Sequence, residues 1–520
     1  MRPRHFFWVA TLLAIGTSGC RTMQPQQGLA GACAEWRWIG ISRPDTRCPE
    51  VPGWTVRPLF AQLAPVEDQC QQSNVPSPAL IRELNRFCVY ESTNRRTNRQ
   101  QLQSLADTSK LVRVDRDCAA HSLVERYSKT EASWSPNPAF LAQAGKPSTP
   151  LRIENQRGVR LAFLDTQPTG GDVPKFQGRS PHGYTLALIA RDLVCAGPER
   201  DARCAAQITT RLALPIIRFD PTKPGHNLTD DTLGGYLGMQ SDLAEAIRSE
   251  VDSWRNENQQ KHLVLNLSLA WDGNLFGGLS VDRIAEMRAG TQAVYRALQY
   301  AASFDALILA AAGNRQREPC ANVGPLLPAA WESQPPRDAT CQEGPTPLLY
   351  AVGGVKSDGW PLGNSRISGM PKRAAYGETA LFSGSSVATA IASAIAAVVW
   401  DSFPELTSDQ VMEILDETGA NLPVTANFYV GAPTPLTSEG PPVRRLLLCA
   451  ALKKACEKHG PPCPLDPQEC EPLLPLEGAA IRAAEPGYCE PWSYPQPPDE
   501  PCPACIPTPP PSGGSGAGGG

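Results

Sequence analysis

The chain has 520 residues, enough for one large domain with extensions or for two to three domains. Hydrophobic residues make up 41% and charged residues 19% of the chain, a balance that suits a globular core. The formal net charge is only −4 at pH 7 and no long basic run is present, which argues against nucleic acid as the main partner.

The first twenty residues have the pattern of a targeting segment. Two arginines precede a short apolar run over residues 6–15, and small residues follow before Cys20. The run is too short for a stable transmembrane helix. Residues 1–20 resemble a bacterial lipoprotein signal, with "TSGC" at the lipobox and Thr17 where leucine is usual. The resemblance implies lipidation of Cys20 and attachment to a cell-envelope membrane. The alternative is an ordinary secretory signal, and both place the mature protein outside the cytoplasm.

The cysteine count agrees with export. Removing Cys20 from the 17 cysteines leaves an even number, which favours disulfides in an exported chain. Residues 21–150 hold five of them and the segment from Cys449 onward holds seven. Because both numbers are odd, at least one disulfide must cross between regions if every cysteine is paired.

Taken in chain order, residues 21–150 are polar and allow no fold assignment, whereas residues 151–425 alternate between two patterns. Short apolar runs predict buried strands of a mostly parallel sheet. Helical spacing covers residues 241–254, with Ser241 as the expected N-cap, and residues 280–302. The alternation predicts a layered α/β domain with helices flanking the sheet and functional residues at the carboxyl ends of its strands. The runs are residues 158–165, 262–271, 305–314 and 347–355.

The composition changes again toward the carboxyl end. Residues 441–511 are rich in proline and cysteine, which predicts a region that depends on cross-links rather than on a conventional core. Cys502 and Cys505 also have a spacing seen in zinc or redox sites, but the proline-rich, exported setting favours disulfides. Residues 512–520 are glycine-rich and are expected to form a flexible tail.

One stretch, "GSSVATA" before an apolar helix, has the features that a nucleophilic serine needs. Small neighbours let a substrate backbone approach Ser386, and a helix that begins there supplies unpaired N–H groups and a positive dipole end. Alone, the stretch is more typical of a capped core helix.

Three companions strengthen this interpretation. Asp165 ends a predicted strand in "AFLDTQ", His182 begins an apolar helix in "HGYTLA", and Asn314 ends another predicted strand in "AAGN". Each of these residues alone is typical of a turn or a cap. Together they place an acid, a base, a nucleophile and an amide donor at element ends.

At these motifs residues 151–425 resemble a subtilisin-like serine protease, the S8 peptidase class. The chain order Asp, His, Ser is that of the family, and "AAGN" matches its oxyanion motif fully. The serine motif departs from the family pattern: Ser385 stands where threonine is usual, Val387 where methionine is usual and Ala390 where proline is usual. Gln167 replaces the glycine after the aspartate motif. These departures leave an inactive relative as an alternative.

The resemblance implies acyl transfer, with Asp165, His182 and Ser386 as catalytic triad and the Asn314 amide with the Ser386 N–H as oxyanion hole. It also implies that two segments line the pocket for the P1 side chain. The resemblance further implies protein or peptide substrates. No cofactor is expected, and calcium is possible by family analogy only. Residues 21–150 stand where the family often has an inhibitory propeptide. The pocket residues would be Ser268, Leu269, Ala270, Ala311, Ala312 and Gly313.

Two functions therefore remain open. The first is an exported, lipid-anchored serine endopeptidase. The second is a surface lipoprotein that keeps the protease fold without its activity and acts as a binding or scaffold protein.

Overall fold

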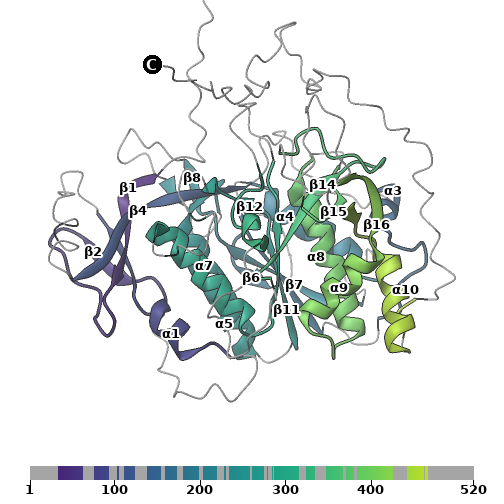
Figure 1. The fold of residues 1–520 in the computed structure, drawn as a ribbon, viewed down its shortest axis with the longest axis horizontal. Helices are drawn as coiled ribbons and strands as arrows, with labels where there is room; N and C mark the ends of the chain where they lie inside the picture. The colour runs from purple at the N-terminus through teal and green to yellow at the C-terminus, as the bar shows by residue number, and fades with distance from the viewer. Residues whose placement is uncertain are drawn as a thin grey trace, which may run out of the picture.

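The four apolar runs predicted as strands lie in one nine-stranded sheet of the computed structural model (Figure 1). Its order is β16-β17-β15-β14-β13-β11-β5-β7-β6, and the neighbours from β17 to β7 pair in parallel. The outermost pairs, β16 with β17 and β6 with β7, are antiparallel. The strands are β5 (Val159–Asp165), β6 (Gly170–Gly171), β7 (Ala206–Leu212), β11 (His262–Leu267), β13 (Leu307–Ala311), β14 (Tyr350–Val355), β15 (Arg373–Tyr376), β16 (Ala420–Thr425) and β17 (Pro442–Arg445).

The structure describes part of the chain, and all structural statements refer to that part. Residues 1–32 and 466–520 lie outside it, so the expected signal with Cys20, the Cys502/Cys505 pair and the flexible tail do too. The described residues are 33–61, 75–92, 102, 104, 110–122, 138–153, 158–171, 180–197, 203–218, 228–229, 234–257, 260–273, 278, 284, 286–314, 324–333, 347–366, 371–379, 383–425, 442–461 and 463–465.

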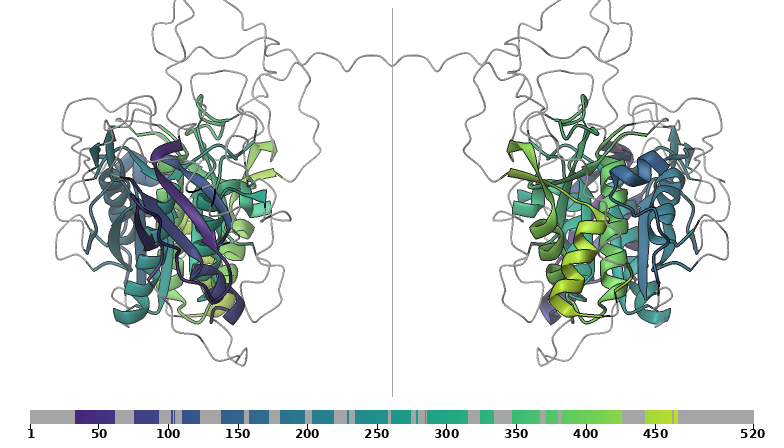
Figure 2. Two further views of the ribbon diagram at one scale, coloured as in Figure 1. Left: turned by 90° about the vertical axis from the view of Figure 1, so that its left-hand side faces the viewer. Right: turned by 90° about the vertical axis from the view of Figure 1, so that its right-hand side faces the viewer.

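Helices cover both faces of the sheet, which explains why its central strands read as continuous apolar runs. In β5, Val159, Leu161 and Phe163 belong to the core on one face, and Ala162 and Leu164 to the core on the other. The first face is covered by α4 (His182–Val194), α8 (Ser385–Ser402), α9 (Ser408–Thr418) and α10 (Leu448–His459), and the second by α5 (Gln240–Glu257) and α7 (Ala289–Ala302) (Figures 1 and 2). The layered α/β class is confirmed.

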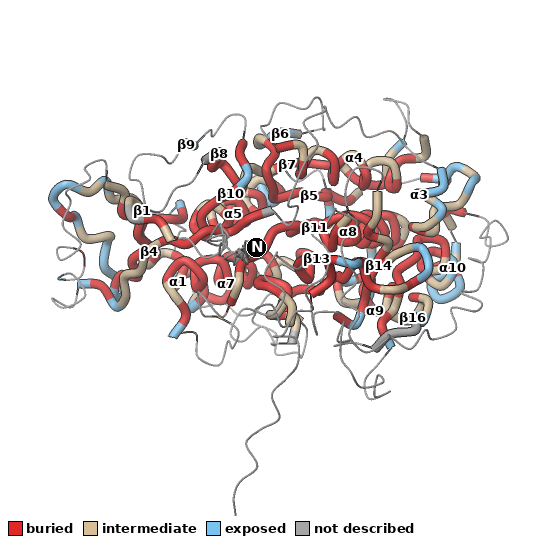
Figure 3. The backbone as a smooth tube through the Cα atoms, turned by 90° about the horizontal axis from the view of Figure 1, so that it is seen from above, coloured by how far each residue is buried: buried red, intermediate tan, exposed pale blue. Residues whose placement is uncertain are grey.

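Helix α8 is the central helix of this arrangement. By length and composition it could cross a membrane, but it is buried within the folded domain (Figure 3). It packs against α4 and against strands β5, β11, β13, β14 and β15. The Ala-rich sequence therefore serves close packing on all sides, and this helix fixes the position of whatever stands at its N-terminus.

The N-terminal region, for which the sequence allowed no assignment, supplies four of the eight strands of a second, antiparallel sheet. Its order is β2-β3-β1-β4-β10-β8-β9, and β12 also pairs with β4. Helices α5 and α7 lie between this sheet and the main sheet. Residues of both sheets and of both helices belong to one apolar core. The remaining elements are β1 (Cys33–Ser42), β2 (Thr55–Pro58), α1 (Pro78–Leu84), β3 (Phe87–Glu91), β4 (Leu111–Ser122), α3 (Pro138–Gln143), β8 (Ile216–Arg218), β9 (Leu228–Thr229), β10 (Leu237–Met239), β12 (Leu269–Ala270) and the 3₁₀-helix η3 (Ala329–Ser333).

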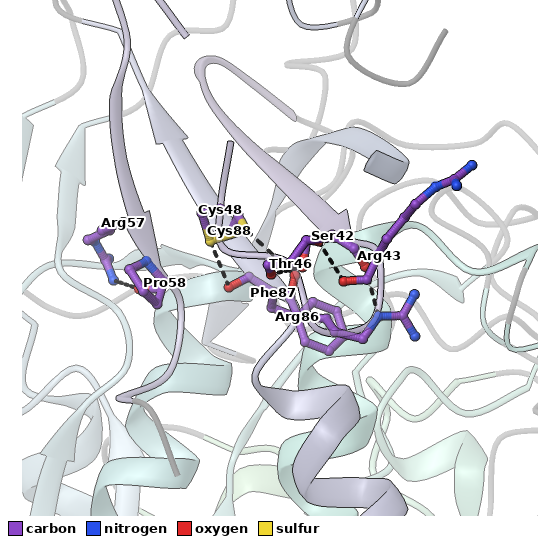
Figure 4. The surroundings of a disulfide bond; sticks show 9 residues. All are labelled: Ser42, Arg43, Thr46, Cys48, Arg57, Pro58, Arg86, Phe87 and Cys88. Atoms are coloured by element: carbon purple, nitrogen blue, oxygen red, sulfur yellow. Dashed lines mark hydrogen bonds between the residues drawn. A yellow bond between two sulfur atoms is a disulfide. The ribbon is translucent and has the colours of Figure 1, made fainter. Parts of the chain in front are cut away.

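Disulfides cross-link this second sheet. Cys33–Cys118 joins β1 to β4 and Cys48–Cys88 ties a loop to β3 (Figure 4). Cys195–Cys204 and Cys456–Cys463 lie in the rest of the described structure. Cys70 lies outside the described residues, so a disulfide that crosses between regions stays a prediction.

Three details differ from the sequence-based expectations. Helix α5 begins at Gln240, and Ser241 is not its N-cap: the Ser241 N–H donates to Asp117 of β4, 3.3 Å away. Helix α7 begins only at Ala289, where its first N–H donates to Asp115. A strand from a distant part of the chain thus satisfies both helix ends, and no local pattern could indicate this.

The boundary expected at residue 425 is also too early. Strand β17 pairs with β15 inside the main sheet, and α10 packs into the same core as α8. Residues 442–465 are therefore part of the α/β domain as far as the structure describes them, and sheet pairing and core packing hold them there in addition to the Cys456–Cys463 disulfide.

Candidate active site

Asp165 and His182 are in contact at the carboxyl end of the main sheet. Asp165 is the last residue of β5, and His182 is the first residue of α4. The His182 Nδ1 atom lies 2.7 Å from one carboxylate oxygen of Asp165 and 2.9 Å from the other. Both side chains are fully buried, so the carboxylate can fix the ring orientation without competition from water.

Glycine and threonine neighbours make this contact possible. A Cβ atom on Gly183 would lie 2.8 Å from the Cβ of Asp165, so only glycine lets the first turn of α4 come this close. The Gly183 N–H donates to Thr166 Oγ1 at 3.1 Å, and the Thr166 N–H donates to Asp165 Oδ1 at 2.7 Å. This is the physical reason for glycine after the histidine and for threonine after the aspartate.

Ser386 stands in the first turn of α8 and is buried. Its hydroxyl donates to the carbonyl oxygen of Ser268, 3.3 Å away. The Ser268 hydroxyl in turn donates to Asn266 Oδ1 at 2.8 Å, with the Ser386 carbonyl oxygen a second acceptor at 3.2 Å. The start of α8 is therefore anchored to the end of β11.

Asn314 contacts the residue before Ser386. Its Oδ1 accepts from the Ser385 N–H at 2.9 Å and from the Ser385 hydroxyl at 3.0 Å. Because Oδ1 takes these donors, the Nδ2 amide faces Gly384, where a Cβ atom would lie only 2.6 Å from it. The Ser385 hydroxyl also accepts from the Gly313 N–H at 3.2 Å, which fixes both segments relative to each other.

The register of β5 and β11 brings the Asp165–His182 pair and the residues around Ser386 to the same edge of the main sheet, at the carboxyl ends of its strands. Asn266 of β11 pairs with Phe163 of β5, so two residues further along each chain Ser268 is level with Asp165. Neighbouring strands lie about 4.8 Å apart. The Ser386 hydroxyl contacts Ser268. It therefore lies at the same height along the sheet as Asp165, beside the neighbouring strand. This edge can supply a base, a nucleophile and an amide donor for acyl transfer.

The two segments expected to line the P1 pocket border the same edge. Residues 268–270 follow β11, and residues 311–313 follow from β13. The five side chains among these six residues are buried, and the sixth residue, Gly313, has a φ of +101°, in the left-handed region that favours glycine.

Strand β4 of the N-terminal region occupies the position beside these residues. Its last residues pair antiparallel with β12, His121 with Ala270 and Ser122 with Leu269. On its other side the same stretch pairs with β10, so β4 is the middle strand of three. An extended segment of the chain therefore lies between β10 and β12, and β12 begins one residue after Ser268.

Sequence reasoning missed both β10 and β4. Neither has a distinctive local pattern: β10 is three residues long, and β4 carries charged residues between apolar ones. Their role arises from pairing between segments more than one hundred residues apart, as in Leu237 with His121.

No metal site is evident among the described residues, which contain no cluster of three or more His, Cys, Asp or Glu side chains that could hold an ion. Calcium, which is possible by family analogy only, stays an untested expectation, and no step of the chemistry is assigned to it.

Comparisons with known proteins give one family match and several solved structures of low similarity. Residues 231–432 match the model of the subtilase family, Peptidase_S8. The match includes Ser268, Asn314 and Ser386, whereas Asp165 and His182 precede it. A search of curated proteins gives no match.

Among solved structures, the MycP3 protease from the type VII (ESX-3) secretion system is 23% identical, with a TM-score of 0.38, and the alignment covers 64% of this chain and 92% of that one. MycP1 from the ESX-1 type VII secretion system is 18% identical, with a TM-score of 0.37 and coverage of 64% and 88%. Sphericase is 18% identical, with a TM-score of 0.34 and coverage of 56% and 91%.

Proposed function

We propose that this protein, which matches the subtilase family model over residues 231–432, is an exported serine endopeptidase that works through an acyl-enzyme intermediate. The observation that carries the proposal is the buried contact between His182 and Asp165, one strand away from Ser386. The family match supports Ser386 as nucleophile, and the contact supplies the acid and base that the matched region lacks.

The proposed reaction uses each side chain in one role. Asp165 holds the His182 ring through Nδ1 and stabilises its charged form, so that Nε2 can take the Ser386 proton. The Ser386 oxygen exchanges its hydrogen bond to Ser268 for this one and attacks the peptide carbonyl carbon. His182 then protonates the leaving amine, and water hydrolyses the ester with His182 again as base.

The oxyanion is proposed to bind at the N-terminus of α8. The Ser386 N–H belongs to the first turn of the helix, where backbone donors have no intrahelical acceptor. The Nδ2 amide of Asn314 is the second donor, since its Oδ1 is engaged by Ser385. Rigid donors of this kind cost no reorganisation when charge develops.

We further propose that the N-terminal region acts as an inhibitory propeptide. In support, residues 119–122 of β4 lie between β10 and β12, where an extended substrate would have to bind. Replacing Ala120 by proline removes a backbone N–H from this middle strand and should free the groove in the full chain. Ala120→Ser, which keeps the N–H, is the matched control.

Labelling with a fluorophosphonate probe tests both proposals. Ser386 should react in the Ala120→Pro variant at least about tenfold faster than in the unchanged chain, and Ser386→Ala should abolish the signal. Labelling in neither background, with the folded state verified by circular dichroism, would favour the inactive binding or scaffold protein instead. Equal labelling in both would contradict the propeptide proposal alone.

Lipid anchoring at Cys20 is proposed from the lipobox-like sequence. Disulfides such as Cys33–Cys118 support an oxidising compartment for the folded protein. We expect the protein to fractionate with membranes in a bacterial host and Cys20→Ala to release it. A membrane fraction that is unchanged by Cys20→Ala would contradict anchoring through this residue.

A further inference from the structure

A short segment, residues 324–328, closes the space between the two segments expected to line the P1 pocket. The Leu326 N–H donates to the Ala312 carbonyl oxygen at 2.9 Å. Leu327 and Trp271 exchange two backbone hydrogen bonds, each 3.0 Å long. The segment is thus hydrogen-bonded to both sides and bridges the end of β12 to the end of β13.

The side chain of Leu326 fills the space between these sides. Leu326, Ala270 and Ala311 form a small apolar cluster separate from the main cores, and Leu326 is only 3% exposed. A Cβ atom on Gly313 would lie 2.8 Å from Leu326 Cδ1, so the leucine already lies against the glycine backbone. Little space is left for a third side chain.

The register of β4 shows which substrate residue would meet Leu326. Residues opposite each other in an antiparallel pair lie on the same face, so His121 shares the face of Ala270. Consider a substrate strand that takes the place and register of β4. Its residue two positions after the one at the place of His121 would stand opposite Ser268, and its side chain would point to the face of Ala270. It would be the residue whose carbonyl faces Ser386, since the Ser386 hydroxyl contacts Ser268. Its side chain is therefore directed toward Leu326.

We propose that Leu326 closes the P1 pocket of this enzyme and that its substrates carry a small residue, such as alanine, glycine or serine, at P1. This inference rests on the proposed protease function. A phenylalanine at P1 would have to displace Leu326 from a close-packed position, which the surrounding segment resists.

Arg366 limits that displacement from the other side. The Arg366 guanidinium Nε donates to the Gly324 carbonyl oxygen at 2.6 Å, at the start of the segment. The Arg366 Cδ atom lies 3.1 Å from where a Cβ on Gly313 would stand. The segment is therefore held at both sides and at its beginning, so Leu326 cannot swing out as a loop residue would.

The test is a series of tetrapeptide p-nitroanilides that differ only at P1, which is Ala, Leu, Phe, Lys or Glu. We measure kcat/KM with the full chain and with Ala120→Pro, and expect alanine to exceed phenylalanine by at least about tenfold, the discrimination that pocket size typically gives. Leu326→Gly and the milder Leu326→Ala should raise phenylalanine relative to alanine by a similar factor. Leu348→Ala is the matched control, since it truncates a buried leucine of another core cluster and should leave the ratio unchanged.

Each outcome separates this inference from the protease proposal. A chain that hydrolyses the phenylalanine peptide as well as the alanine peptide, or a ratio that does not move in either Leu326 variant, overturns the role of Leu326. A preference for glutamate or lysine at P1 also overturns the role of Leu326, because charged side chains near the pocket would then set the preference. Failure of every peptide together with failure of Ser386 to react with the phosphonate contradicts the protease proposal instead.

Discussion

Replacing Gly183 by alanine tests whether the close approach of α4 to Asp165 matters for catalysis. The added Cβ would lie 2.8 Å from Asp165 Cβ, closer than real Cβ atoms approach, and 3.1 Å from Oδ1, which is tight. Asp165 cannot retreat easily, because its carbonyl oxygen accepts from the N–H groups of Ala213 and Leu214, at 2.9 and 3.2 Å. We therefore expect helix α4 to move, and His182 with it.

The size of the movement follows from contact distances. To reach ordinary contact at 3.4 Å the first turn of α4 must retreat by roughly 0.6 Å. The His182–Asp165 contact, now 2.7 Å, would lengthen by a similar amount and leave the range of a strong hydrogen bond. Since a 1 Å misplacement can cost roughly a hundredfold, we expect kcat to fall about tenfold to a hundredfold.

The change that Gly183→Ala makes in the free energy of unfolding should be small, because it has two opposing contributions. Alanine stabilises a helix by about 0.5–1 kcal/mol relative to glycine. Overpacking costs typically about 1–3 kcal/mol, so we expect a modest net loss.

The assay is kcat with a P1-alanine peptide in the Ala120→Pro background, together with thermal unfolding. Gly197→Ala is the matched control, because a Cβ there meets no atom within 4 Å. A Gly183→Ala variant with unchanged kcat and unchanged unfolding would show that α4 adapts without cost, and would refute the argument from close approach.

Three further predictions concern other parts of the structure. Asn314→Ala should lower kcat by roughly 10²–10³ with little change in KM, a magnitude taken from subtilisin itself; an effect on KM alone would remove Asn314 from the oxyanion site. Burial raises the pKa of Asp117 to about 7, against the attraction of Arg37 and with repulsion from Asp242. The docked N-terminal sheet therefore binds a proton that the released chain gives up near pH 4, and its docking should weaken as pH rises through about 7. Hydrogen exchange of β4 should report this loss, and Asp117→Asn should make it pH-independent; protection that rises with pH would reverse the assigned sign. Fully buried Glu250 accepts from Arg160 at 2.7 Å and from Arg211 at 2.8 Å. Glu250→Ala removes the buried carboxylate beside Arg160 and leaves it with Glu257, which is 42% exposed, as its carboxylate partner. The fold should lose up to about 3–5 kcal/mol in chemical unfolding, whereas a loss below about 1 kcal/mol would mean that Glu257 and water replace the lost carboxylate.

The sequence predicted the central strands because burial on both faces leaves a continuous apolar run. β5 illustrates this, since its seven residues are all buried and Asp165 is the last of them, where the apolar run ends. The motif around Ser386 was readable for a similar reason, because a buried helix must be apolar on all sides. The contact between Asp165 and His182 was only implied by family resemblance, and the structure shows it as a distance.

What the sequence could not reveal depends on long-range pairing. Strand β4 obtains its place from β10 and β12, which are separated from it by more than one hundred residues. Ser241 looked like an N-cap because serine favours that position, yet Asp117 from β4 takes its N–H. The proline-rich composition beyond residue 441 concealed β17 and concealed that the short helix readable there, α10, packs into the core of α8.

The most direct test of the account asks whether His182 and Ser386 act as one unit. We would measure kcat for His182→Ala, Ser386→Ala and the double variant in the Ala120→Pro background, with a P1-alanine peptide. Side chains that perform one proton transfer are not additive, so the double variant should be no slower than either single variant, as in subtilisin. If the two losses instead multiplied in the double variant, the residues would act independently, and the proposed proton transfer from Ser386 to His182 would be contradicted.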